Sequence, residues 1–303
     1  MTSGIKNSLN LLQNGIKQAV SEIDNIDYID EIRLRCEKPL SVVIDAKNYF
    51  VEEGGKLCNA VNENCFTVSK GDIEYAFKSA FSYSIHSYSK ELAGGYITTE
   101  GGNRVGICGT AVIAGESRDR VDSVKYISSI NIRISREVFG YAHDLYNRCL
   151  ANNPVGILII GPPSSGKTTL LRDLTRLAGN RYKVSLVDEL NEISYTYRSE
   201  PQKDVGMFTD VFVGYPKHIG ISTAVKVMSP QIIACDEIGS LEDAKALEYA
   251  LHSGVSLITA VHSSSFDEAK NKPGIAALLR EKAFAFTAIL DPISRNYKVM
   301  KID

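Results

Sequence analysis

Two spacings of apolar residues distinguish the elements expected in the N-terminal half of the chain. Near the start, Ile5, Leu9, Leu12, Ile16 and Val20 recur every three or four residues, which predicts one helix with a single apolar face. Alternation of apolar and polar residues then predicts strands, and helical spacing returns once before a glycine-rich stretch. The expected strands are residues 31–35, a hairpin of 41–44 with 49–51, the glycine-rich strands of 94–115, and 130–135, and the expected helix is 73–81.

The C-terminal half has a different pattern, because its apolar residues occur in short unbroken runs. The runs are residues 155–160, 184–187, 231–235 and 255–261. Such runs are typical of strands that are buried on both faces of a parallel sheet. We therefore expect a smaller α+β domain over residues 1–150 and an α/β domain over residues 151–303. The two are expected to join after a helix at residues 138–150.

The first apolar run leads into a loop with a strong chemical signature. Residues 161–169 read GPPSSGKTT, so Gly161, Gly166, Lys167 and Thr168 match the pattern of glycine, four residues, glycine, lysine and hydroxyl between a strand and a helix. In such a loop, backbone N–H groups and the start of the helix surround a phosphate. The lysine neutralises the β- and γ-phosphates and the hydroxyl binds Mg²⁺. The predicted ligands are ATP and Mg²⁺.

All nine residues of this loop are candidate nucleotide-binding residues, and Lys167 is also a candidate catalytic residue. Prolines at the loop entrance stiffen it without removing the N–H donors nearer the helix. Thr168 is the metal ligand expected within the loop. The nucleotide-binding set is Gly161, Pro162, Pro163, Ser164, Ser165, Gly166, Lys167, Thr168 and Thr169.

Acidic residues follow two of the later apolar runs. In an open α/β sheet the ligand lies beyond the carboxyl ends of the strands, so these residues are expected near the phosphate loop. After the third run, we predict that Asp236 belongs to the Mg²⁺ shell and that Glu237 polarises the attacking water. After the second run, Glu189 and Glu192 are predicted either to orient water or assist Mg²⁺, or to be a helix cap or surface pair.

Histidine and arginine supply the remaining candidates. His262 ends the fourth run, where a neutral imidazole can sense the γ-phosphate, and the alternative is an ordinary hydrogen-bonding group. A ring ATPase commonly needs an arginine from outside the phosphate loop to stabilise charge on the γ-phosphate. Arg104, Arg133 and Arg136 are candidates for that role, and a solvated strand edge or an ion pair is the alternative for each.

Composition limits the partners and the compartment. The 303 residues are 44% hydrophobic and 23% charged with a formal net charge of −2, so the overall charge indicates neither nucleic acid nor an anionic membrane, although a local basic patch stays open. The six cysteines are widely separated and are expected to be reduced. No run approaches the ~20 apolar residues of a membrane span, so we expect a cytoplasmic protein that docks peripherally at a membrane through partner proteins.

Several motifs together resemble the stage III sporulation protein AA family, which is similar to the motor ATPases of type II and type IV secretion systems. The resemblance rests on GPPSSGKTTLLRDLTR, VSLVDELNEIS, GYPKHIGISTAVKVMSPQIIACDEIGS and TAVHSSS, with EIRLR and GGYITTEGGNRVGICGTAV upstream. The sequence departs from the family pattern at Leu190 and Lys226, where the family often has arginine, and at Ser263, where it usually has glycine.

The resemblance implies a RecA-like P-loop NTPase domain at the C-terminus, an N-terminal domain that contributes to the neighbouring subunit's site, and a ring, taken as a hexamer. It implies ATP hydrolysis in which Glu237 or Glu189 activates water, with His262 in the histidine segment of the family. It also implies a role in endospore formation. There the motor would energise a secretion-like channel between mother cell and forespore, docked on the membrane proteins of the stage III sporulation channel complex.

Two functions of other classes stay open. A nucleic-acid-binding ATPase is one, since RecA-like domains also drive helicases, and it would bind single-stranded DNA or RNA in a salt-dependent manner. The near-neutral net charge argues mildly against it. A nucleotide-dependent assembly switch is the other, and it would bind ATP tightly with little turnover.

Overall fold

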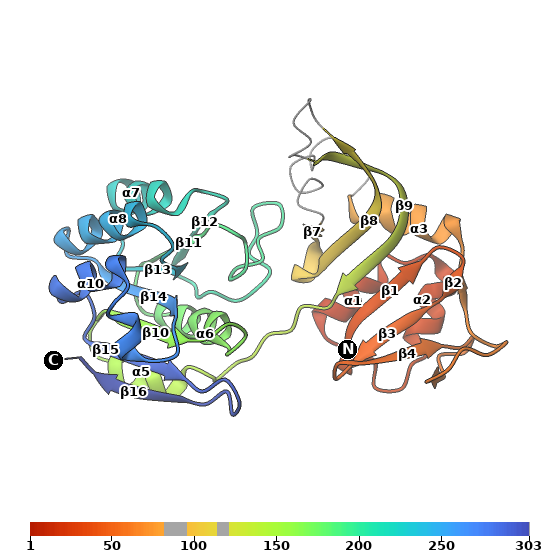
Figure 1. The fold of residues 1–303 in the computed structure, drawn as a ribbon, viewed down its shortest axis with the longest axis horizontal. Helices are drawn as coiled ribbons and strands as arrows, with labels where there is room; N and C mark the ends of the chain where they lie inside the picture. The colour runs from red at the N-terminus through yellow and green to blue at the C-terminus, as the bar shows by residue number, and fades with distance from the viewer. Residues whose placement is uncertain (82–95, 114–120, 303) are drawn as a thin grey trace. The chain divides into compact units, whose positions relative to one another are not determined.

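The computed structural model describes residues 1–81, 96–113 and 121–302, and the chain divides into two compact units, Met1–Arg136 and Glu137–Asp303. Each unit has its own sheet and its own hydrophobic core (Figure 1). The division comes earlier than the boundary expected at residue 150. The helix expected from residue 138 begins only at α5 (His143–Cys149), and its Leu145 and Cys149 pack in the core of the second unit, so this helix belongs to that unit.

The first unit is a seven-stranded sheet with helices packed against one face. Its strand order is β5-β4-β3-β1-β9-β8-β7, and all the strand pairings given for it are antiparallel. The elements are α1 (Ser3–Leu9), α2 (Asn14–Ser21), β1 (Ile29–Arg35), β3 (Ser41–Ile44), β4 (Lys47–Val51), β5 (Leu57–Cys58), α3 (Lys70–Ala80), β7 (Tyr96–Thr98), β8 (Arg104–Ile113) and β9 (Val121–Arg133), with β2 (Lys38–Pro39) and β6 (Thr67–Val68) as a separate pair. The strands expected at 31–35, 41–44 and 49–51 are confirmed, and so is the helix at 73–81. Gly94, Gly95 and residues 114–115 of the glycine-rich stretch lie outside the described residues.

The prediction of one helix at the N-terminus is wrong, because α1 and α2 are separate. Asn10 ends α1 and Gln13 precedes α2. The break lets the adjacent Leu11 and Leu12 both enter the core, with 8% and 2% of their surface exposed. On one straight helix, neighbouring residues point about 100° apart, so a single face cannot bury both as fully.

The second unit is a mainly parallel sheet with helices on both faces. Its strand order is β12-β11-β13-β14-β10-β15-β16, and only the last pairing is antiparallel. The strands are β10 (Ile157–Gly161), β11 (Val184–Asp188), β12 (Thr209–Val213), β13 (Ile232–Glu237), β14 (Ser256–His262), β15 (Phe286–Leu290) and β16 (Tyr297–Lys301). The helices besides α5 are α6 (Lys167–Gly179), α7 (Lys217–Met228), α8 (Leu241–His252), α9 (Phe266–Ala269) and α10 (Pro273–Arg280).

The helices divide between the two faces of this sheet according to which side chains they bury. Residues of α5 and α6 share a core with one set of strand residues, and residues of α7, α8 and α10 share a core with the alternate set. All four apolar runs of the sequence are confirmed as buried strands. Because β10, β11, β13 and β14 are parallel, their carboxyl ends meet at one edge of the sheet, where ligands of open α/β sheets bind.

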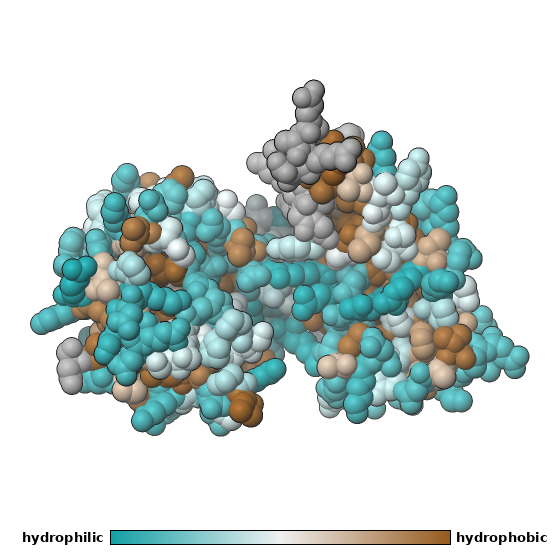
Figure 2. Space-filling model, viewed as in Figure 1, coloured by the Kyte–Doolittle hydropathy of each residue, from teal (hydrophilic) through white to brown (hydrophobic). Residues whose placement is uncertain are grey.

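The surface is mostly hydrophilic on the face drawn in Figure 2, with apolar side chains scattered over both units. Within the described part of the chain, no helix combines the length and the apolar character that crossing a membrane requires.

Candidate active site

The phosphate loop connects the buried end of β10 to the start of α6. Ser164 and Gly166 have left-handed backbones, with φ of 61° and 102°, so the chain turns sharply twice before the helix begins at Lys167. A Cβ on Gly161 would lie 2.4 Å from Oγ of Ser165. A side chain at position 161 would therefore displace the hydroxyl of Ser165 where the loop folds back on itself, and the helix N-terminus faces the space that the loop encloses.

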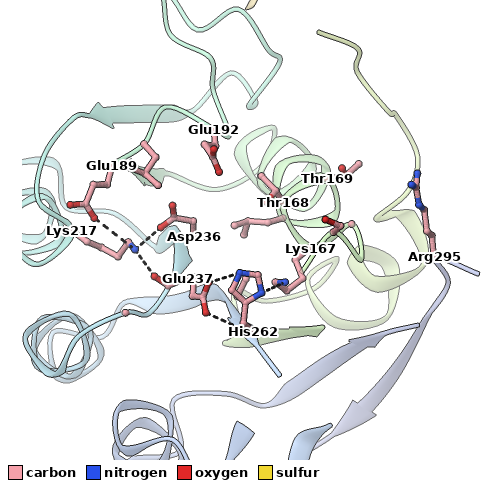
Figure 3. A pocket seen from close by; sticks show the side chains of 16 residues that line it. Lys167, Thr168, Thr169, Glu189, Glu192, Lys217, Asp236, Glu237, His262 and Arg295 are labelled. Carbon is pink, nitrogen blue, oxygen red and sulfur yellow. Dashed lines mark hydrogen bonds and ion pairs between the residues drawn. The ribbon is translucent and has the colours of Figure 1, made fainter. Parts of the chain in front are cut away.

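A cavity of about 740 Å³ opens over this loop (Figure 3). Small-molecule and cofactor sites typically have about 300–1,000 Å³. Five of the nine candidate loop residues line the cavity, namely Ser164, Gly166, Lys167, Thr168 and Thr169. Gly161, Pro162, Pro163 and Ser165 are not among its lining residues and belong to the turn that shapes it. The predicted Glu189, Glu192, Asp236, Glu237 and His262 also line it, together with two residues that the sequence analysis missed, Lys217 and Arg295.

Lys167 is held inside the loop. It is 6% exposed, and its Nζ donates to the carbonyl oxygen of Pro162 at 2.8 Å. The same Nζ lies 2.6 Å from Nδ1 of His262 (Figure 3). Burial lowers the pKa of Lys167, and the nearby Lys272 adds to the effect against the opposing charge of Glu237. The ammonium group is thus desolvated and placed to bind an anion.

His262 joins Lys167 to Glu237. Its Nε2 lies 2.8 Å from Oε2 of Glu237, and its backbone N–H donates to Oε1 of the same carboxylate at 3.1 Å. With Nδ1 facing the Lys167 ammonium, the matching tautomer carries its proton on Nε2 and donates it to Glu237. The expected proximity of phosphate loop, second acidic strand end and histidine is therefore present, as a chain of contacts from Lys167 through His262 to Glu237.

Asp236 pairs with a lysine that the sequence analysis did not single out. Nζ of Lys217, at the start of α7, lies 2.6 Å from Oδ1 of Asp236 and 4.0 Å from Oε2 of Glu189, and it donates to the carbonyl oxygen of Glu237. Burial raises the pKa of Asp236 despite the positive charge of Lys217. Burial is the largest single influence on the pKa of Lys217 and would lower it, but the negative charge of Asp236, its hydrogen bond and the neighbouring Cys235 and Asp243 together raise the pKa.

A sequence signal for Lys217 existed in the position of the lysine directly after Pro216. Proline favours the first turn of a helix, and a cation in the first turn opposes the helix dipole. A buried lysine at such a place requires a carboxylate partner, which here is Asp236.

The first acidic group divides into residues with different tasks. Asp188 is fully buried and accepts hydrogen bonds from the backbone N–H groups of Glu192 and Ser194, both at 2.8 Å, and from Oγ of Ser194 at 2.7 Å. It therefore organises the turn after β11. That turn places Glu189 and Glu192 at the cavity.

The three candidate arginines lie in the first unit, and none is among the residues that line the described cavity. Nε of Arg133 lies 3.6 Å from Oε1 of Glu31. Nη2 of Arg136 lies 3.1 Å from Oδ1 of Asp30. The guanidinium of Arg104 lies over the ring of Tyr96, 5.0 Å from its centroid. Their predicted role toward a neighbouring subunit stays a prediction.

Comparison with known proteins agrees with this architecture. A family model described as "Sporulation stage III, protein AA" matches residues 5–302. Stage III sporulation protein AA of Bacillus subtilis (strain 168) is 34% identical over 282 residues, which cover 90% of this chain and 87% of the relative.

Solved structures of ATPases share the fold. The pilus retraction motor PilT, solved with bound ADP, gives a TM-score of 0.60 at 12% identity, covering 95% of this chain and 82% of PilT. The Legionella pneumophila ATPase DotB gives 0.51 at 16% identity, covering 90% and 76%. The predicted fold class, a RecA-like P-loop NTPase domain preceded by a smaller α+β domain, is confirmed. From its sequence and its fold, the chain belongs to the sporulation stage III protein AA family.

Proposed function

We propose that this chain is an ATPase that hydrolyses ATP to ADP and phosphate in the cavity over the phosphate loop. The observation that supports the proposal is the chain of contacts from Lys167 through His262 to Glu237. Lys167 would neutralise the β- and γ-phosphates, while the backbone N–H groups around Gly166 bind them. Glu237 would accept a proton from the attacking water.

Mg²⁺ fits the oxygen donors at this site. In nucleotide sites the ion is usually held by one or two side-chain ligands, waters and the phosphates of the substrate. The hydroxyl of Thr168 and the carboxylate of Asp236 both line the cavity. Lys217 contacts Oδ1 of Asp236, so Oδ2 is the oxygen that would meet the Mg²⁺ shell. The ion would supply positive charge that stabilises the phosphates during transfer.

His262 would act as the sensor of the γ-phosphate. Two of the three donors of the Lys167 ammonium face the carbonyl of Pro162 and Nδ1 of His262, which leaves one for a phosphate. When phosphate draws the ammonium away, His262 loses one partner and keeps the other, Glu237. Binding of phosphate in the loop would thereby change the hydrogen bonding of His262, which contacts the proposed base, Glu237.

Glu237 is preferred over Glu189 as the residue that activates water. Two donors of His262 fix the carboxylate of Glu237 beside the phosphate loop. The side chains of Glu237 and Glu189 are similarly exposed, 34% and 40%, but the ion pair of Glu189 is the longer one, with Nζ of Lys217 at 4.0 Å from Oε2. A base that is already held in place contributes more to proton transfer than one that must be positioned during the reaction.

Membership of the family and the fold shared with PilT support a further step, that the chain works as a homo-oligomeric ring, taken as a hexamer. The first unit would contribute an arginine, Arg104, Arg133 or Arg136, to the site of the next subunit. The ring would dock at the cytoplasmic face of the membrane proteins of the sporulation channel complex and energise the channel between mother cell and forespore.

We expect Mg²⁺-dependent ATP turnover per subunit to rise with protein concentration, because a site completed by a neighbour exists only in the assembled ring. The measurement is steady-state phosphate release over a wide concentration range, with sedimentation at the same concentrations. The Lys167→Ala variant provides the blank.

A rate that stays flat while sedimentation shows monomer becoming oligomer would contradict shared sites. Absence of turnover above the blank, with tight ATP binding, would favour the assembly switch over the motor.

The nucleic-acid-binding alternative has one specific observation in its favour. Cross-strand pairing places Arg33 and Arg35 of β1, Arg133 of β9 and Arg104 of β8 on the face of the first sheet that is opposite its hydrophobic core. Binding of a single-stranded oligonucleotide that weakens steeply with salt and is lost in Arg33→Ala with Arg35→Ala would favour this function.

Arg295 is expected to bind the nucleoside end of ATP. It lies in the turn between β15 and β16, on the other side of the phosphate loop from Asp236 and Glu237 (Figure 3). With the γ-phosphate next to Glu237, the rest of the nucleotide extends toward Arg295. The Arg295→Ala variant should raise KM for ATP about tenfold, the cost of one charged contact, with kcat nearly unchanged.

Inorganic tripolyphosphate has no nucleoside, so its inhibition of the reaction tests which end of ATP Arg295 binds. In Arg295→Ala the inhibition constant of tripolyphosphate should change less than KM for ATP. An equal loss for both ligands would place Arg295 at the phosphates instead.

A further inference from the structure

A bulge near the end of β13 decides on which face of the sheet Glu237 lies. Residues 232–235 pair regularly with β14, ending with Cys235 opposite Thr259, but the next pair is Glu237 with Ala260. Asp236 is thus one extra residue on this strand. In a regular ladder without the bulge, Asp236 would pair with Ala260 and Glu237 with Val261, so the side chain of Glu237 would leave on the opposite face.

The bulge has a direct consequence for the site. Side chains of Ala260 and His262 share a face of β14 because they are two residues apart. Pairing with Ala260 places Glu237 on that same face, and its carboxylate there contacts Nε2 of His262 at 2.8 Å. The contact between the proposed base and the proposed sensor therefore depends on the shift in register at the bulge.

Lys217 bonds to both residues of the bulge. Its Nζ lies 2.6 Å from Oδ1 of Asp236 and also donates to the main-chain carbonyl of Glu237. With 6% of its surface exposed, the ammonium group is shielded from the solvent that would weaken these contacts. Oγ1 of Thr259 completes the set by donating to the carbonyl of Asp236 at 2.8 Å.

Global stability alone is a weak reason for this arrangement. Burying an ion pair costs desolvation that its attraction barely offsets, and apolar replacements are often as stable. The ion pair of Lys217 with Asp236 does not require the additional hydrogen bond from Lys217 to the main-chain carbonyl of Glu237. This hydrogen bond fixes the main chain at Glu237, whose side chain must point toward His262.

We propose that Lys217 is a positioning residue, which holds the bulge at Asp236 so that Glu237 stays on the His262 face of the sheet. Its ammonium is engaged by Asp236 and by the carbonyl of Glu237, so it acts on the reaction through Glu237. The inference rests on the proposed ATPase activity, and it adds a residue of α7 to the determinants of catalysis.

The Lys217→Met variant removes the ammonium and keeps a side chain of similar length. We expect kcat for ATP to fall about 100-fold, as for a misplaced catalytic group, while KM changes less than about threefold because the phosphate loop is untouched. Lys217→Arg, which keeps a donor and a charge, should recover part of kcat. The Lys245→Met variant, at an exposed lysine of α8, is the matched control and should resemble the native protein.

A double variant separates positioning from stability, because Lys217→Met alone leaves Asp236 buried without its partner. Lys217→Met with Asp236→Asn removes both charges and should recover most of the melting temperature lost in the single variant. Because Asp236 is also the proposed Mg²⁺ ligand, kcat falls in this variant in any case, and the readout is the contact of His262 with Glu237 in the ¹⁵N resonances of the His262 ring. The carbonyl of Glu237 still lacks its donor, so these resonances should stay shifted. Native resonances together with a recovered melting temperature would overturn the proposal.

A readout without turnover distinguishes this inference from the proposed function. The ¹⁵N resonances of the His262 ring report its contact with Glu237, and they should shift in Lys217→Met but not in Lys245→Met. If the native protein does not hydrolyse ATP but the resonances shift, the ATPase proposal fails and the positioning role stands. Unchanged resonances in a folded Lys217→Met variant would contradict the positioning role.

Discussion

Replacing Glu237 with glutamine is expected to lower ATP turnover by about 10²–10⁴-fold, the range for loss of a general base, while ATP binding stays close to native. The glutamine side chain has nearly the same size and can still accept a hydrogen bond from His262, so the cavity keeps its shape. It cannot take a proton from water at neutral pH. Steady-state phosphate release and equilibrium binding of ATP, measured on the same preparation, test both halves of the prediction.

The Glu189→Gln variant decides between the two acidic groups. If Glu237 is the base, Glu189→Gln should lose much less turnover than Glu237→Gln. The Glu242→Gln variant, at an exposed glutamate in the first turn of α8, controls for the loss of one negative charge. Near-native turnover in Glu237→Gln, with a large loss in Glu189→Gln, would transfer the role to Glu189.

Replacing Asp188 with alanine is expected to cost roughly 3–5 kcal/mol in the free energy of unfolding. The buried carboxylate accepts from backbone N–H groups of the turn after β11 and from Oγ of Ser194. Alanine leaves the backbone donors without this acceptor, while Oγ of Ser194 keeps Asn191 and Thr196 as partners. Each buried unsatisfied group costs about 1–3 kcal/mol. Urea unfolding followed by circular dichroism measures the loss as a lower midpoint.

Two further variants test whether the lost stability comes from the hydrogen bonds of Asp188. Asp188→Asn keeps the shape and one acceptor oxygen, so its midpoint should lie between those of the native protein and Asp188→Ala. Asp210→Ala, at an exposed residue of the neighbouring strand β12, should leave the midpoint unchanged. A native midpoint for Asp188→Ala would show that water replaces the carboxylate, and Asp188 would then not organise the turn.

The two predictions together separate the tasks of neighbouring acidic strand ends. Asp188 and Asp236 both follow buried apolar strands, and each is engaged by protein groups, namely backbone N–H donors for Asp188 and the Lys217 ammonium for Asp236. The residues after them, Glu189 and Glu237, line the cavity. In both places the aspartate is held by protein groups, Asp236 being in addition the proposed Mg²⁺ ligand, and the following glutamate is a candidate for activating water.

The contacts around His262 would couple the proposed nucleotide binding to the proposed catalysis. One imidazole contacts both the phosphate-loop lysine and the proposed base, at 2.6 Å and 2.8 Å. A neutral imidazole has one donor and one acceptor nitrogen, so a change of partner on one side affects the bond on the other.

Local sequence determined the parts of this protein that depend on a few consecutive residues. The phosphate loop was recognisable because its glycines, lysine and hydroxyl must follow one another between a strand and a helix. The acidic strand ends and His262 were predictable because unbroken apolar runs indicate parallel strands, and parallel strands bring their carboxyl ends to one edge. Most strands of both units followed from the same spacing of apolar residues.

Only the tertiary structure decided the features that depend on residues far apart in the chain. Lys217 enters the site because α7 packs against β11, the neighbour of β13 in the sheet, and the bulge at Asp236 appears only in the register between β13 and β14. The break between α1 and α2 follows from the burial of Leu12 in the core of the first unit. The earlier boundary of the units follows from the burial of Leu145 in the core of the second unit. The spacing of apolar residues along the sequence predicts which residues share one face of a helix or strand. Which other element packs against that face is decided by the free energy of the whole unit, because packing involves residues from several segments at once.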